Sequence, residues 1–242
     1  MLLNNINYGH FNISTIFNPP TFLNYEPNNY FYYLDHYPSF TRGLEKVLFY
    51  YYIVYMTDLK KLLGHSLSDK EIKDFFDDKI NVLRYSDLND YASLDDVLGK
   101  YRRAIILFMN RGNLNHWCLV HEVDIKGQKP YLEWFDSYGI IPDNEFDYIP
   151  KSFQSLSKQK RGTLIKLLIN QPLQVHYSQY RLQELHKGIN TCGVWCCVRA
   201  LYNMISEDEF AKLFRSGEQF GLTPDELVSL LFYKELGAIN LI

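Results

Sequence analysis

The spacing of hydrophobic and polar residues changes along the chain and predicts both strands and helices. Residues 103–109, 115–124 and 130–136 are short runs rich in β-branched and aromatic residues, which predicts three consecutive strands. Residues 152–169 repeat their apolar positions at helical spacing, and residues 173–177 return to a strand pattern. We therefore expect a small mixed sheet with helices around it.

Several helix starts are marked by capping signals. Ser68, Ser206 and Thr223 each stand three residues before a glutamate, which is the spacing of a capping box. A further helix is predicted over residues 192–205, because apolar residues at helical spacing follow Cys192. The predicted fold class is α+β, with the sheet packed on a central helix that begins at this cysteine.

The first hundred residues differ from the rest. Residues 1–42 are rich in Asn, Pro and aromatic residues, and residues 43–99 have a mainly helical pattern in which Ser93 caps another short helix. We expect two regions: a largely helical N-terminal extension over residues 1–100 and a core over residues 101–242.

Composition narrows the class of protein. Of the 242 residues, 47% are hydrophobic and 16% aromatic, which is ample for a core, and a formal charge of −3 makes nucleic acid an unlikely strong partner. The longest apolar stretch, Leu48 to Met56, is too short to cross a bilayer, and the start lacks a basic signal region. Four cysteines without a signal peptide indicate a reducing compartment. We expect a soluble intracellular or packaged protein that is not secreted and has no membrane partner.

Three residues carry the candidate chemistry. Cys192 opens a predicted helix, and a helix N-terminus favours the thiolate, lowering a cysteine pKa from its usual value of about 8.5. His116 lies on one predicted strand and Asp136 ends the next, so a carboxylate can hold one imidazole nitrogen while the other takes the thiol proton. The pattern predicts a nucleophile, a base and an orienting acid in the chain order His, Asp, Cys.

His116-Trp117, then Asp136-Ser137, then Gln183 ahead of Cys192-Gly193 resembles the superfamily of ubiquitin-like-protein proteases and adenovirus maturation proteases. The similarity covers about residues 101–205 and is greatest to the branch found in virophages, Polinton-type elements and large DNA viruses. It implies an adenovirus-protease-like fold and a cysteine endopeptidase that processes capsid or other virion proteins beside glycine or other small residues. It also implies a virion or host-cytoplasm location. We expect a monomer without cofactor or metal.

The resemblance implies Gln183 as the oxyanion-hole side chain, completed by the backbone N–H of Cys192. Gln183 stands nine residues before Cys192, a longer spacing than in better-known members, and Asn190 is the alternative donor. Trp117 and Trp195 flank the catalytic positions, and either they narrow the substrate channel or they are core residues.

Other interpretations stay open. Cys118, Cys196 and Cys197 are expected to be structural, a zinc site built from the cysteines is a weak alternative, and His121 is expected at the surface or rim. If Asp136 does not orient His116, Glu133 and Asp124 are the next candidates. The same residues would also serve a deconjugase for a ubiquitin-like modifier or, less readily, an acyltransferase, and the chain could instead be an inactive binding module.

Overall fold

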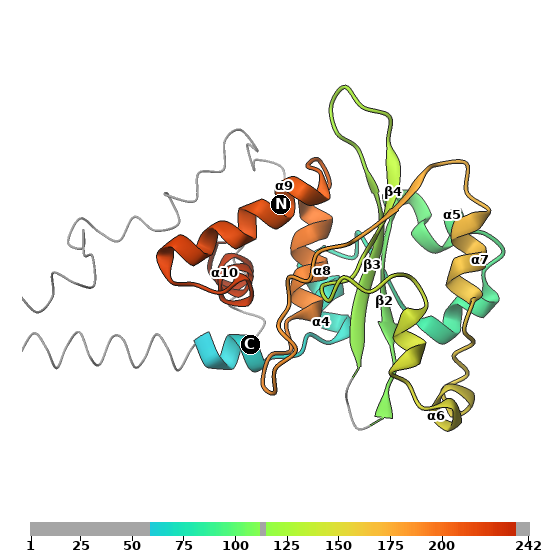
Figure 1. The fold of residues 1–242 in the computed structure, drawn as a ribbon. Coiled ribbons are helices and arrows are strands. Elements are labelled where there is room, and N and C mark those ends of the chain that lie inside the picture. The colour runs from blue at the N-terminus through green and yellow to red at the C-terminus, as the bar shows by residue number, and fades with distance from the viewer. Residues whose placement is uncertain (1–58, 112–114, 236–242) are drawn as a thin grey trace, which may run out of the picture. The chain divides into compact units, whose positions relative to one another are not determined.

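A five-stranded mixed sheet lies at the centre of residues 58–242, one of the two units into which the chain divides (Figure 1). The computed structural model describes residues 59–111 and 115–235. The sheet and the helices around it confirm the predicted α+β class. Residues 1–58 of the N-terminal region expected over residues 1–100 lie outside the described residues.

The strands follow one another across the sheet in chain order. They are β1 (Asn81–Arg84), β2 (Arg103–Phe108), β3 (His116–Val123), β4 (Tyr131–Phe135) and β5 (Val175–Tyr177). The outer pairs, β1 with β2 and β4 with β5, are parallel, and the two inner pairs are antiparallel. The predictions of β2 to β5 are confirmed, whereas β1 falls in a region that was expected to be helical.

Helices cover both faces of the sheet (Figure 1). On one side lie α4 (Asp69–Phe75), α8 (Cys192–Leu201), α9 (Glu207–Arg215) and α10 (Pro224–Leu230). On the other lie α5 (Leu94–Leu98), α6 (Lys151–Leu156) and α7 (Thr163–Ile169). Among the described residues no helix combines the length and apolar character needed to span a membrane.

Local capping chemistry sets several of these helix starts. The capping boxes at Ser68, Ser206 and Thr223 are all formed, and Ser93 accepts a hydrogen bond from the backbone of Asp96. The single helix expected over residues 152–169 is wrong. It is divided into α6 and α7 because the chain turns between them, with positive φ values of 57° at Lys158 and 89° at Gly162.

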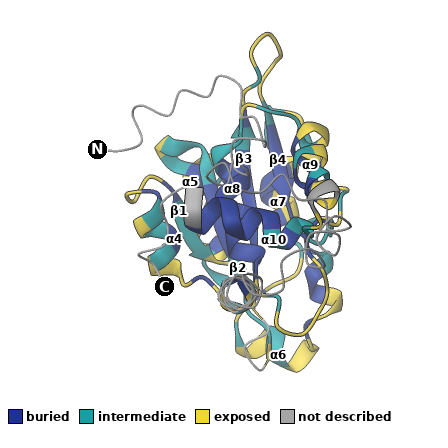
Figure 2. Ribbon diagram, turned by 90° about the vertical axis from the view of Figure 1, so that its left-hand side faces the viewer, coloured by how far each residue is buried: buried dark blue, intermediate teal, exposed yellow. Residues whose placement is uncertain are grey.

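The helix α8 packs against β3 and is buried along nearly its whole length (Figure 2). Its Arg199 makes two 2.7 Å hydrogen bonds to the carboxylate of Glu133 on β4, and both side chains are buried. His121 also faces this pair, with Nε2 3.3 Å from the Glu133 carboxylate, and is only 1% exposed. The expectation that His121 lies at the surface is therefore wrong, because the face of β3 that carries it is covered by α8.

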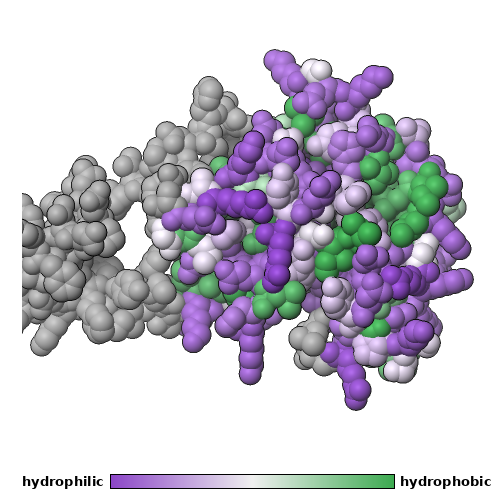
Figure 3. Space-filling model, in the orientation of Figure 1, coloured by the Kyte–Doolittle hydropathy of each residue, from purple (hydrophilic) through white to green (hydrophobic). Residues whose placement is uncertain are grey.

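A second core fills the opposite face of the sheet, where β2, β3 and β4 meet α5 and α7. The outer surface in the view of Figure 3 is mostly hydrophilic, with hydrophobic side chains gathered towards α7. There Ile169 is 74% exposed. The sheet is thus enclosed on both faces, and the candidate chemistry lies at one end of its strands.

Candidate functional site

The pairing of β3 with β4 brings His116 and Asp136 together. Leu119 pairs with Phe135, so continuing the register by one residue sets Asp136 opposite Cys118 and diagonal to His116 on the same face. His116 Nε2 lies 3.1 Å from Asp136 Oδ2. The ring of Tyr138, two residues beyond Asp136, stacks on the His116 ring at 4.8 Å. The sequence therefore predicted this contact correctly.

Asp136 is a fully buried carboxyl surrounded by donors. Its Oδ1 accepts the backbone N–H of Tyr138 at 2.7 Å, and its Oδ2 accepts the Cys118 thiol at 3.3 Å besides the His116 ring. Burial alone would raise the pKa of Asp136, but the charge and hydrogen bond of His116 outweigh it and lower that pKa. Asp136 therefore remains an anion that can hold an imidazolium.

Cys192 is the first residue of α8, as predicted, and is 5% exposed. Because His116 Nε2 faces Asp136, its Nδ1 is the nitrogen left for the cysteine. Burial by itself lowers the pKa of His116, but Asp136 and a hydrogen bond with Cys192 hold that pKa well above its usual value. The structure thus assembles the thiol, imidazole and carboxyl that the sequence singled out, from a helix start and the ends of two strands.

The two candidate oxyanion donors have different surroundings. Gln183 is buried, and its Oε1 accepts the Ser137 hydroxyl at 2.7 Å, which leaves the amide NH₂ as the other end of the side chain. Its backbone N–H also bonds the Ser137 carbonyl. Asn190 instead is exposed and uses its amide NH₂ on the Gly64 carbonyl at 2.9 Å. Gln183 is therefore tied to the residue after Asp136, and Asn190 holds a loop.

Asp225, at the start of α10, joins this loop to the start of α8. Its buried carboxylate accepts the Thr191 hydroxyl, the Trp195 indole N–H at 2.8 Å and the backbone N–H of Glu184 at 2.8 Å. In the sequence, Asp225 lies between Thr223 and Glu226 of a capping box and carries no other signal. No local pattern indicates its role, because its partners lie far from it along the chain.

The two tryptophans have different positions. Trp195 has no exposed surface and packs against Phe214, so it is a core residue, the alternative left open for it. Trp117 donates its indole N–H to the Leu67 carbonyl at 2.9 Å. A Cβ atom built on Gly193 would lie only 3.1 Å from atoms of both Leu67 and Trp117, so glycine lets them approach the residue next to Cys192.

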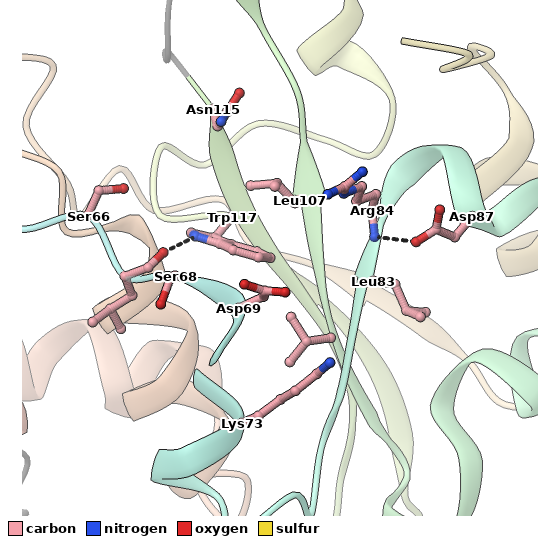
Figure 4. Close-up of a pocket in the computed structure, with 12 residues that line it drawn as sticks. Ser66, Ser68, Asp69, Lys73, Leu83, Arg84, Asp87, Leu107, Asn115 and Trp117 are labelled. Atoms are coloured by element: carbon pink, nitrogen blue, oxygen red, sulfur yellow. Dashed lines mark hydrogen bonds between the residues drawn. The ribbon is translucent and has the colours of Figure 1, made fainter. Parts of the chain in front are cut away.

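Trp117 and Leu67 also line a pocket of about 410 Å³ (Figure 4). Its other walls come from the start of α4 and the ends of β1 and β2. They are mainly polar and carry both charges: Asp69, Lys73, Arg84 and Asp87. Cys192 does not line this pocket, but Leu67 and Trp117 of its wall also pack against Gly193, the residue after Cys192.

One buried group of side chains has donors that suit a metal ion. The donor atoms of His116, Cys118, Asp136 and Glu145 all lie within 4.8 Å of one another. Imidazole, thiolate and carboxylate are ligands that zinc accepts, although here the same atoms are engaged in hydrogen bonds around Asp136. All four cysteines are free buried thiols, and burial raises the pKa of Cys118, Cys196 and Cys197, as expected for structural cysteines.

Comparison with known proteins gives a family. No protein-family model matches the chain. Over 177 residues it is 34% identical to the uncharacterized protein V9 of Sputnik virophage, an alignment that covers 73% of this chain and 99% of V9. This chain belongs to the V9 family. The relationship identifies a virophage-related protein, and because V9 is itself uncharacterized, the protease branch inferred from the sequence stays a prediction.

Proposed function

We propose that this V9-family chain is a cysteine endopeptidase that processes capsid or other virion precursor proteins. The observation that carries the proposal is the contact of His116 Nε2 with Asp136 at 3.1 Å, beside a cysteine that opens a helix. The raised pKa of His116 and its interaction with Cys192 favour a thiolate–imidazolium pair. An adenovirus-protease-like fold agrees with the mixed sheet and the central helix, and the virophage relative agrees with a virion substrate.

Each residue then has one task. The Cys192 thiolate attacks the scissile carbonyl, and His116 gives its proton to the leaving amine. Asp136 holds the His116 ring in one tautomer and balances its positive charge. The Gln183 amide and the Cys192 N–H, which has no partner within its own helix, bind the oxyanion. Water then releases the acyl group with His116 as the base.

The pocket beside Trp117 is the proposed groove for the substrate chain. Its walls carry both charges, which suit a peptide with polar side chains rather than a hydrophobic ligand. Close packing of Leu67, Trp117 and Gly193 leaves little room next to the nucleophile. A narrow passage of this kind favours glycine or another small residue at the cleavage site.

The proposal is tested with capsid protein encoded by the same genome. Wild-type protein is expected to produce fragments whose new N-termini follow small residues, as read by N-terminal sequencing. Cys192→Ala and His116→Ala should each reduce turnover by roughly four to six orders of magnitude while leaving the circular dichroism spectrum unchanged. Cys197→Ala, which removes another buried α8 thiol, is the matched control and should cleave normally.

Three results would overturn the assignment. Cleavage by Cys192→Ala at the wild-type rate would exclude this nucleophile. Release of a ubiquitin-like modifier from an isopeptide bond, without any cleavage of capsid protein, would favour the deconjugase instead. A thiol-directed probe that fails to label Cys192 in the folded protein would favour an inactive binding module.

A further inference from the structure

A second buried carboxyl lies beside the His116–Asp136 pair. Glu145 belongs to the short 3₁₀ helix η6 (Asn144–Asp147) and is 6% exposed. Its Oε1 lies 3.9 Å from His116 Nε2 and has no hydrogen-bond partner among the described residues. A carboxyl oxygen of Glu145 also lies within 4.8 Å of one of Asp136, so the two acids are close enough to interact directly. The chemistry proposed above assigns no task to this group.

Two adjacent buried carboxyls cannot both be ionised at low cost, so one must keep a proton. Asp136 accepts hydrogen bonds from a backbone N–H, the Cys118 thiol and His116, and is therefore the better site for the charge. Burial, opposed by the charge of His116 and supported by that of Asp136, raises the pKa of Glu145 to about 8. At neutral pH Glu145 is thus a neutral acid and a hydrogen-bond donor.

We propose that Glu145 is a positioning residue, whose protonated carboxyl donates a hydrogen bond to Asp136 and holds Asp136 in line with His116. The inference deepens the proposed function, since the aligned pair is the catalytic base and its acid. Glu145 does not touch the substrate or the nucleophile in this role. It acts through Asp136, and loss of its proton removes the donor and sets two negative charges side by side.

The groups around Glu145 show which charges would respond. Glu145 faces His116 and Cys118 of β3, and it faces Asp136 and Tyr138 of the turn after β4. Burial raises the pKa of the Cys118 thiol, which therefore stays a donor. Within its own turn, Asp147 is exposed and paired with Arg161. His116 is the one cation in this group, so ionisation of Glu145 would raise the pKa of His116 further.

The first test compares the pH profiles of Glu145→Gln, which keeps a donor but cannot ionise, and Glu145→Leu, which has neither property. A group with a pKa of about 8 is roughly tenfold less protonated at pH 9 than at pH 7, so wild-type turnover should fall by about that factor. Glu145→Gln should keep most of the pH 7 turnover and lose this alkaline fall. Glu145→Leu should turn over slowly throughout with an unchanged KM, and Asp147→Asn, in the same turn, should behave as wild type.

The second test needs no substrate. Nitrogen-15 NMR of the His116 ring in full-length protein should show an inflection near pH 8 that is absent in Glu145→Gln. If this inflection appears but no protein is cleaved, the inference stands and the proposed function fails. If Glu145→Gln retains both the inflection and the alkaline fall, Glu145 is not the titrating group and the inference is overturned.

A third test asks whether Glu145 binds a metal ion instead of a proton. Zinc bound to His116, Cys118, Asp136 and Glu145 would displace the proton from Glu145, and the carboxyl would then be a ligand instead of a donor. One equivalent of zinc in the purified protein, lost in both Cys118→Ala and Glu145→Gln, would therefore overturn the inference. Absence of bound zinc after incubation with zinc chloride and desalting would support it.

Discussion

At the scale of single residues, the site depends on keeping a buried Asp136 charged. A buried carboxylate is costly unless donors surround it, and Asp136 has them from its own backbone turn, from β3 and from Glu145. The charge in turn fixes which nitrogen of His116 carries the proton. Asp136 is therefore both the best-satisfied polar group of the site and the one on which the histidine depends.

Asp136→Asn should lower turnover by more than about tenfold while substrate affinity stays near wild type, because an amide cannot stabilise the imidazolium. Steady-state kinetics on the capsid substrate measures both quantities. Asp143, in the loop after β4, would be a poor control, because it is buried and its carboxylate accepts hydrogen bonds from Tyr85 and Gly162. The exposed Asp124 is a suitable control, and an equal loss in Asp124→Asn would refute the role of Asp136.

Substitution of the two candidate oxyanion amides, Gln183 and Asn190, should separate an effect on catalysis from an effect on stability. Gln183→Ala should raise the barrier by about 2.7–4 kcal/mol with little change in KM, since it removes one oxyanion donor. Asn190→Ala should instead cost roughly 0.5–1.5 kcal/mol of unfolding free energy, because its amide bonds the Gly64 carbonyl. Kinetics and urea unfolding of both variants decide the matter. A slow but fully stable Asn190→Ala, beside an active Gln183→Ala, would reverse the assignment.

At the scale of elements, the start of α8 must fit against the loop before α4 and against β3. Gly193→Ala adds a methyl group that would lie 3.1 Å from Leu67 and from Trp117. Overpacking of this kind costs about 1–3 kcal/mol, which exceeds the gain of about 1 kcal/mol from replacing a helical glycine. We expect lower thermal stability and a higher KM, because Trp117 also lines the pocket.

Gly64→Ala is the matched control for that variant. Gly64 is also helical, but its built Cβ is 3.5 Å from its nearest neighbour, which is an ordinary contact. This substitution should leave stability unchanged or slightly higher. If Gly193→Ala is as stable as Gly64→Ala and binds substrate equally well, the close approach does not constrain the site.

The elements that the sequence could predict are those whose signals lie within a few residues of one another. Strands β2 to β4 and the capped helices have signals within a few residues, so their positions were predicted, and the His116–Asp136 contact followed from adjacent strands. Strand β1 was missed because its four residues include only two apolar ones and it forms by pairing with β2, which comes later in the chain. Glu145 and Asp225 were missed for a similar reason. Their partners reach them only through tertiary packing.

At the scale of the whole molecule, one buried ion pair links the main sheet to the central helix. Arg199 and Glu133 are both buried, and Arg199 also bonds the carbonyl of Ile205 beyond its helix. Burial would raise the pKa of Glu133, but the charge of Arg199 and hydrogen bonds from His121 and Arg199 lower it to about 2. Protonation of the Glu133 carboxyl should therefore lower the free energy of unfolding, because it breaks the ion pair that joins the sheet to α8.

The sign of the pH dependence follows from that pKa. A carboxyl whose pKa is lower in the folded state than its unfolded value of about 4.3 contributes stability above that pH. This contribution, on the order of 3 kcal/mol, should be lost as the pH falls from about 4.3 to about 2. Urea unfolding of the wild-type protein between pH 7 and pH 3 should show the start of this loss.

Glu133→Gln assigns the loss to this pair. At pH 7 it leaves Arg199 buried without a counter-charge and should cost about 3–5 kcal/mol, and the difference from wild type should shrink as the pH falls below 4. The exposed Arg161–Asp147 pair is the comparison: Asp147→Asn should change the unfolding free energy by less than about 1 kcal/mol at any pH. A Glu133→Gln deficit that stays constant from pH 7 to pH 3 would mean that packing around residue 133, and not its charge, holds the sheet to α8.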